Sequence, residues 1–392
     1  GCGQPVVVAG VGAVEFGLFP AEPRHHLARR GDLDQPGVVV GRHGLGQVDL
    51  HRHLGRALAV ALTLLLAVVA MVSLGHGASG VSAPQVLADW LAGREIALTD
   101  RVVLLDIRLP RLATGILVGA GLAVSGAVMQ GLFRNPLADP GLVGVSAGAG
   151  LGAITAIVLG GALPPALAAA AGVNLVPLAA FFGGLAATLV LHAIASRRGR
   201  TSVATMLLGG IALAALTGAA SGLLIYLADD SQLRTLTFWS MGSLAGASWP
   251  QLIAAGPLMM AALIAAPFLA RGLNGLALGE AAAFHMGMPV ERTKRVAVLT
   301  VAASVGAAVA ISGGIGFIGL VVPHLLRLAT GPDHRRLLPN AALLGAVLLV
   351  LADLVSRTIV APSELPIGII TAIAGGPVFI AILLRQRGVM DL

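Results

Sequence analysis

Residues 108–148 read RLPRLATGILVGAGLAVSGAVMQGLFRNPLADPGLVGVSAG and decide the fold of the whole chain. After Arg111 the sequence continues for about twenty residues without a charge, the helix length that crosses the ~30 Å hydrocarbon core of a bilayer. The run ends in the polar segment 134–140, where an asparagine and an aspartate are each followed by a proline. Lipid cannot satisfy the backbone of such a break, so protein or a water-filled cavity must cover it. The stretch therefore predicts a membrane helix with an ordered break at its end.

The overall composition points the same way. Of the 392 residues, 57% are hydrophobic and 11% are charged, which excludes a soluble globular domain. The net charge of +7 comes almost entirely from arginines in short loops between apolar runs, a pattern that indicates a lipid membrane rather than nucleic acid as the partner. The single cysteine, Cys2, excludes a disulfide framework and a cysteine-based metal site.

The apolar runs predict an all-α polytopic membrane protein. Residues 54–392 form the predicted transmembrane domain, whereas residues 1–53 hold no membrane-length run and are interpreted as a poorly ordered or non-native extension. The twenty-residue criterion gives about ten spans. They are expected near 57–75, 111–132, 141–161, 174–195, 203–228, 250–270, 293–312, 315–330, 337–358 and 366–385.

The loop arginines predict the orientation of these spans. Alternate loops carry most of the positive charge, and the positive-inside rule then places both termini in the cytoplasm. A shift of 187 residues superposes Ser125-Gly126 on Ser312-Gly313 and Pro136 on Pro323. Because the superposed spans cross in opposite directions, we interpret this as an inverted repeat, which in transporters places the pathway near the repeat interface.

The motifs of this chain resemble a known family. The Arg-Leu-Pro-Arg entry at 108–111, the Ser-Gly-Ala-Val-Met-Gln run at 125–130 and residues 134–148 are similar to the permeases of bacterial ABC importers for iron-siderophores, haem and cobalamin. The resemblance covers roughly residues 55–387. It implies a type II ABC importer permease fold in the bacterial inner membrane and a homodimer with the pathway at its interface. It also implies two ATPase subunits that hold ATP and Mg, and a periplasmic binding protein. The chain itself would be non-catalytic and bind no cofactor.

Three arginines break the orientation rule, since Arg108, Arg111 and Arg357 fall at the outer mouth. One interpretation is that they snorkel and pair with Asp106 or Asp353. The other is a dock for carboxylates, because guanidinium groups bind carboxylates in a bidentate manner. The resemblance implies that these three arginines receive glutamates of the binding protein.

Two further groups of residues are expected at the cytoplasmic side. The segment after the sixth span is predicted to form a short amphipathic helix. This helix could be a simple surface helix. The resemblance implies instead that it is the segment that contacts the ATPase. Its residues are Gly279, Glu280, Ala281, Ala282 and Gly287. The resemblance also implies a cytoplasmic gate formed by Asn135, Leu137, Thr201 and Ser202.

For the transported substrate we favour haem, with ferric siderophore or cobalamin as alternatives. Residues 232–244 and 331–336 look more like haem permeases than cobalamin permeases. A different class, an ion-coupled secondary transporter, is disfavoured because the span centres lack the acidic pair that such a carrier needs. A membrane enzyme is disfavoured because the sequence has no evident nucleophile and base. No metal site is expected from the scattered histidines.

Overall fold

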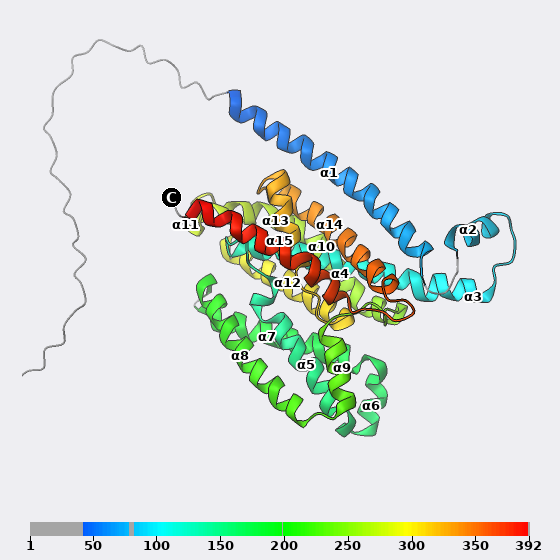
Figure 1. Ribbon diagram of the computed structural model, residues 1–392. Helices are drawn as coiled ribbons and strands as arrows, with labels where there is room; N and C mark the ends of the chain where they lie inside the picture. Colours follow the sequence, from blue (N-terminus) through cyan, green and yellow to red (C-terminus); the bar gives the residue numbers. More distant parts are fainter. Residues whose placement is uncertain (1–41, 78–81, 198, 391–392) are drawn as a thin grey trace, which may run out of the picture. The chain divides into compact units, whose positions relative to one another are not determined.

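The computed structural model describes residues 42–77, 82–197 and 199–390, and nearly all of them are helical. Residues 1–41 of the predicted extension lie outside this part, while the remainder of it already belongs to the first helix. The long helices are α1 (Arg42–Gly75), α4 (Leu109–Leu132), α5 (Val145–Leu159), α7 (Leu175–Ala195), α8 (Val203–Leu227), α10 (Trp249–Ala277), α12 (Val290–Ser312), α14 (His334–Thr358) and α15 (Ile367–Met390) (Figure 1).

Shorter elements connect these helices. They are α2 (Ala83–Leu91), α3 (Leu98–Arg101), the π-helix η1 (Val102–Arg108), η2 (Pro140–Val143), η3 (Gly160–Ala162), α6 (Pro165–Ala171), η4 (Gly172–Asn174), α9 (Asp230–Ser240), α11 (Glu280–His285) and α13 (Ile318–Thr330). The two strands β1 (Ser196–Arg197) and β2 (Arg200–Thr201) pair antiparallel and form a small hairpin between α7 and α8.

Nine helical segments of the described chain are long and apolar enough to cross a membrane, so the polytopic all-α prediction is confirmed. The second of them is longer than expected. It runs over residues 98–132, because α3 and η1 continue directly into α4. The charged side chains at 100, 101, 106 and 108 concealed this extension from a search for uncharged runs.

The eighth expected span, 315–330, contains a shorter helix than predicted. Only α13 is helical there, and its 13 residues are too few to cover the hydrocarbon core. The preceding segment 313–317 is non-helical, with Gly313 at φ 68° and Phe317 at φ 66°. Three glycines among these five residues weaken helix formation, which explains why the helix begins only at Ile318.

The core is built around α4 and α12. These are the most buried of the nine segments, with 83% and 72% of their most apolar stretches buried. Helix α4 packs against α10, α12, α13 and α14. Two glycine pairs allow the backbones to meet, since a Cβ atom on Gly119 would overlap the carbonyl oxygen of Gly345 and one on Gly126 would overlap that of Gly319. Close approach of this kind supplies the packing energy that association in lipid requires.

A second group of helices lies beside this core. Helices α5, α7 and α8, drawn in green and blue-green in Figure 1, pack against one another, and α9 contacts α5. Helix α12 contacts both α5 and α7 and so joins this group to the core. A capping box of Asp229 and Gln232 starts α9, a helix that the search for spans did not predict.

Candidate functional site

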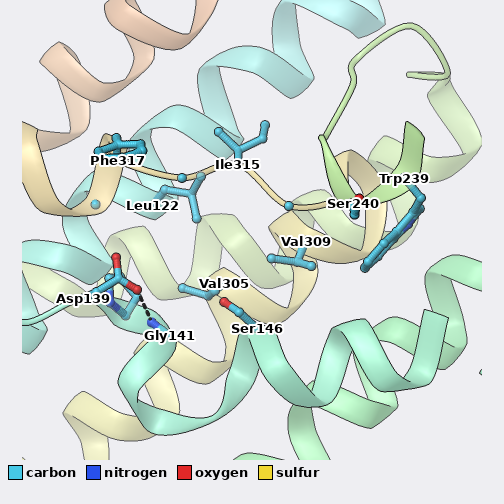
Figure 2. A pocket seen from close by; sticks show the side chains of 14 residues that line it. Leu122, Asp139, Gly141, Ser146, Trp239, Ser240, Val305, Val309, Ile315 and Phe317 are labelled. Atoms are coloured by element: carbon cyan, nitrogen blue, oxygen red, sulfur yellow. Dashed lines mark hydrogen bonds between the residues drawn. The ribbon is translucent and has the colours of Figure 1, made fainter. Parts of the chain in front are cut away.

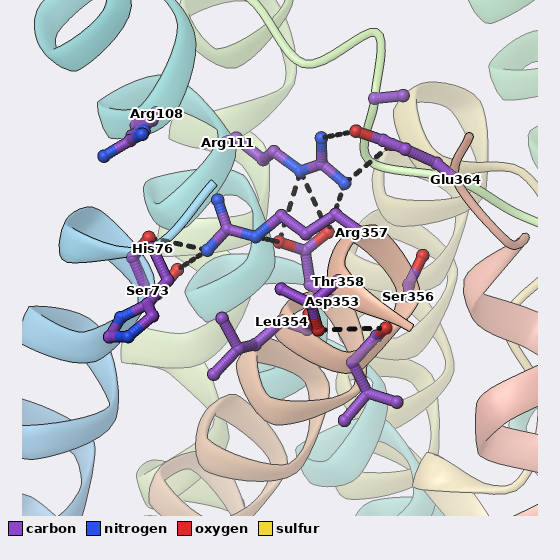
Figure 3. Close-up of polar contacts among 12 residues, drawn as sticks. Ser73, His76, Arg108, Arg111, Asp353, Leu354, Ser356, Arg357, Thr358 and Glu364 are labelled. Atoms are coloured by element: carbon purple, nitrogen blue, oxygen red, sulfur yellow. Dashed lines mark hydrogen bonds and ion pairs between the residues drawn. The ribbon is translucent and has the colours of Figure 1, made fainter. Parts of the chain in front are cut away.

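At one end of the bundle, five charged residues form what we call the arginine cluster: Arg108, Arg111, Asp353, Arg357 and Glu364 (Figure 3). Arg111, near the start of α4, is its centre. Its Nε donates to Asp353 Oδ1 at 2.9 Å, and its two terminal nitrogens donate to the two Glu364 carboxylate oxygens at 2.8 and 2.9 Å. The guanidinium therefore holds two carboxylates of its own chain, one of them in bidentate geometry.

The other two arginines complete the cluster. The Nε atom of Arg357 lies 3.7 Å from Asp353 Oδ2. Its Nη2 donates to the backbone oxygen of Ser73 at 2.6 Å and to the Ser73 hydroxyl at 2.7 Å. Arg108 donates to the backbone oxygen of Leu74. The cluster thus ties the end of α1 to α4, to α14 and to the loop between α14 and α15.

The three arginines that were predicted to dock a binding protein are buried. Arg108 is 4% exposed, and Arg111 and Arg357 are each 7% exposed. The pairing with Asp353 that we considered as the alternative is present for Arg111 and Arg357. The cluster is accessible to solvent at Glu364, because the side chain of this residue is 35% exposed. The docking role stays a prediction, and in this state a partner must compete with the chain's own carboxylates.

The expected short helix after α10 is confirmed as α11, between Gly279 at φ 104° and Gly287 at φ 75°. Glu280 begins it and accepts a hydrogen bond from Lys294 Nζ at 2.7 Å. Only Ala283 of this helix is buried. A Cβ atom on Gly279 would lie 3.8 Å from a guanidinium nitrogen of Arg134, so the loop after α4 reaches the same region.

The four predicted gate residues occupy two connections. Asn135 accepts from the backbone N–H of Leu137 at 2.9 Å and shapes the turn after α4. Thr201 is buried at the end of β2, and Ser202 caps α8 by accepting from the N–H of Thr205 at 3.2 Å. Within the described chain no hydrogen bond joins the Asn135 turn to Thr201, so their shared gating role stays a prediction.

Sequence reasoning missed two residues beside the gate and the short helix. Lys294 and Glu291, both in the first turns of α12, link Glu280 to Thr201. We call the set Thr201, Glu280, Glu291 and Lys294 the lysine cluster. The available signal was that Lys294 is the only lysine in the sequence.

A cavity of about 410 Å³ lies where the two breaks in the helical structure meet (Figure 2). One wall is the break after α4, with Asp139 and Gly141, and another is the non-helical segment before α13, with Ile315 and Phe317. Trp239 of α9 closes a further side. Both breaks line a cavity, as expected for non-helical backbone at membrane depth.

Asp139 offers a test of how this cavity is built. It accepts from the Gly141 N–H at 2.7 Å and caps η2. Burial raises the pKa of its carboxyl, although the hydrogen bond from Gly141 acts in the opposite direction. The ionised form is therefore disfavoured in the fold, and the stability that Asp139 contributes falls as pH rises from its unfolded pKa through its raised folded pKa.

We expect Asp139→Asn to leave the thermal unfolding midpoint unchanged or slightly raised at neutral pH, because the amide keeps the accepting oxygen and removes the buried charge. Asp139→Ala removes the cap and should lower stability by about 1 kcal/mol. Unfolding of both purified variants in detergent measures the difference. Equal losses in the two variants would show that the charge, not the cap, is needed.

Within residues 42–77, 82–197 and 199–390, no group of three or more histidine, cysteine or acidic residues lies close enough to hold a metal ion. A bundle of long apolar helices with a cavity between two breaks fits a polytopic transport protein. The chain belongs to the FecCD transport family, whose match spans residues 65–385. It is a permease subunit of the type II ABC importer class.

Two sequence relatives and one solved structure show the extent of the similarity. The hemin transport system permease protein HmuU of Yersinia pestis is 47% identical over 326 residues, which cover 83% of this chain and 95% of HmuU. The cobalamin import system permease protein BtuC of Halobacterium salinarum is 44% identical over 294 residues, or 75% of this chain and 76% of BtuC. An inward-facing metal-chelate type ABC transporter has a TM-score of 0.74 and 32% identity, and the match covers 84% of this chain and 99% of that one.

Proposed function

We propose that this chain moves haem across the bacterial inner membrane as the permease of an ATP-driven importer. The observation that carries the substrate is the 47% identity to a hemin permease over 95% of that protein's length. Cobalamin is the second candidate, because a cobalamin permease is 44% identical over a shorter match. Both ligands are bulky, and either suits an importer of this class.

The proposed assembly contains two copies of this chain, two ATPase subunits and a periplasmic haem-binding protein. The pathway lies between the two copies, and both termini of each copy lie in the cytoplasm. Glu280, Ala281 and Ala282 with the bracketing Gly279 and Gly287 contact the ATPase. This role is supported by the separate, largely exposed helix α11 that these residues form at the end of α10.

ATP-driven uptake into proteoliposomes tests the proposal. The chain is reconstituted with its ATPase and binding protein, and the uptake of haem, a ferric siderophore and cobalamin is compared. We expect haem uptake that stops without ATP and survives a protonophore. Uptake of one of the other ligands replaces the substrate only. Uptake that ignores ATP and collapses with the protonophore would overturn the permease assignment in favour of a secondary transporter.

We further propose that the arginine cluster is the dock for the binding protein, with Glu364 as the exchangeable partner. Arg111 is held by Asp353 in the interior and by Glu364 at the partly exposed side. An acidic side chain of the binding protein can replace Glu364 on the Arg111 fork while Asp353 stays in place. The chain's own carboxylate therefore competes with the docking partner.

This competition predicts that Glu364→Gln tightens docking. The amide keeps the volume but holds Arg111 less strongly, and we expect about fivefold higher affinity, which corresponds to about 1 kcal/mol for a partly exposed pair. Arg111→Glu should weaken docking in a salt-dependent manner. Affinity for the binding protein is measured in nanodiscs, with the exposed Glu95→Gln as the control. An unchanged or lower affinity in Glu364→Gln contradicts the exchange.

A further inference from the structure

Lys294 is a buried charged residue in the first turns of α12. It is the only lysine among 25 basic residues, and it is 2% exposed. Its ammonium group donates to three oxygens: the backbone oxygen of Thr201 at 2.8 Å, Glu280 Oε2 at 2.7 Å and Glu291 Oε1 at 3.2 Å. An ammonium has three N–H donors, so all of them are used. A charge buried at this level is costly unless it is fully paired, and Lys294 is fully paired.

The lysine cluster fixes Thr201 on both sides of its peptide. Lys294 binds its carbonyl oxygen, and Glu291 Oε2 accepts from its N–H at 2.8 Å. Thr201 also pairs with Ser196 across the β1–β2 hairpin, where their hydroxyl oxygens are 3.0 Å apart. The hairpin and the start of α8 are therefore attached to the first turn of α12 through the backbone of a single residue.

The same ammonium reaches α11 through Glu280. The Glu280 side chain is 43% exposed, whereas the Lys294 side chain is 2% exposed, so the contact runs from the surface into the buried cluster. Phe284 of α11 is 71% exposed. The Lys294 ammonium therefore connects Glu280 of α11 with Thr201, which lie 14 and 93 positions from it in sequence.

We propose that Lys294 is the positioning residue that transmits movement of α11 to the α7–α8 connection at Thr201. The inference rests on the proposed function, in which α11 contacts the ATPase and Thr201 lies at the gate. Other contacts between α11 and α12 hold the short helix on the bundle. Within the described chain, the polar contacts that join α11 to the hairpin are those of the lysine cluster.

The first test compares haem uptake and ATP hydrolysis in the complete importer with Lys294→Met. The methionine fills a similar volume without the three hydrogen bonds. We expect hydrolysis within about twofold of the unchanged protein and uptake per ATP lower by about tenfold, in the range of measured coupling between sites. Arg295→Met is the matched control, because it removes a neighbouring exposed charge from the same helix. Lys294→Arg should recover most of the uptake.

The outcomes separate this inference from the proposed function. Uptake per ATP that is unchanged in Lys294→Met overturns the link and leaves the permease assignment intact. Equal loss of hydrolysis and uptake, with the complex assembled, also overturns it, because Lys294 would then only support the ATPase contact. If the unchanged importer moves no haem with ATP, the proposed function fails instead.

A second measurement tests the link without any substrate. Arg200→Cys places a thiol on the exposed strand next to Thr201, in a background where Cys2, the only native cysteine, is replaced by serine. The rate of maleimide labelling should differ between the nucleotide-free and ATP-bound complexes. Lys294→Met should remove this difference, and Arg295→Met should keep it. A nucleotide-dependent rate that persists in Lys294→Met overturns the proposal. If Lys294→Met does not assemble, Glu291→Gln, which weakens the hold on the Thr201 N–H, takes its place.

Discussion

Replacing Gly126 with alanine should be among the most destabilising single changes in this chain. A Cβ atom there would overlap the backbone carbonyl of Gly319, where α4 crosses the start of α13. Backbone cannot rotate away as a side chain can, so the two helices must separate and lose their contact. We expect a loss of about 3 kcal/mol, at the upper end of the cost of overpacking. The thermal unfolding midpoint in detergent and the yield of folded protein in membranes measure it.

Gly150→Ala is the matched control in the interior of α5. A Cβ atom there meets nothing within 4 Å in the described part of the chain. Since alanine favours a helix over glycine by about 1 kcal/mol, this variant should be neutral or slightly stabilised. Opposite signs for the two substitutions support backbone contact at Gly126. Similar behaviour of both would mean that α4 and α13 do not approach so closely in the membrane.

Removing Asp353 should have an effect of similar size. It is 2% exposed and lies between Arg111 and Arg357, so Asp353→Ala leaves two buried guanidinium groups without their shared counter-ion. Breaking a buried ion pair by deleting one partner costs about 3–5 kcal/mol. Asp353→Asn should be nearly as damaging, because the amide restores an acceptor but not the charge. Thermal unfolding of the purified variants gives the comparison.

The control is an aspartate that pairs with arginine at the surface. Asp89 Oδ1 lies 3.2 Å from Arg94 Nε, and the Arg94 side chain is 67% exposed. Because exposed ion pairs contribute little, Asp89→Ala should change the free energy of unfolding by less than about 1 kcal/mol. A loss in Asp353→Ala no greater than that in Asp89→Ala would show that water reaches the arginine cluster. In that case the cluster does not hold α1, α4, α14 and the loop before α15 together.

Much of the fold could be predicted because membrane insertion depends on local properties. Length and hydrophobicity of a run decide whether it can span the bilayer, and nine of the ten expected spans are present among the described helices. The tenth, at 315–330, is present only as the shorter helix α13, because a count of apolar residues does not register that three glycines precede it. The early start of the second span was missed because a search for uncharged runs stops at the charged residues 100, 101, 106 and 108.

The short helix at Glu280 was also foreseeable, since Gly279 and Gly287 mark both of its ends in the sequence. The partners of the charged residues were not. Whether Arg111 faces lipid headgroups, a docking protein or Asp353 depends on how α4 and α14 pack, and the two residues are 242 positions apart. The sequence supports each possibility equally.

By itself the sequence determined the class of fold, the family and the positions of the breaks, because apolar length, proline and glycine act over a few neighbouring residues. Only the tertiary structure decided which charges meet. Lys294 illustrates the difference, since in sequence it is one of several basic residues before an apolar run, and in the fold it joins Glu280 to Thr201. A buried charge requires oxygens on three sides, and only the packing of α12 against α11 and the α7–α8 hairpin brings those oxygens together.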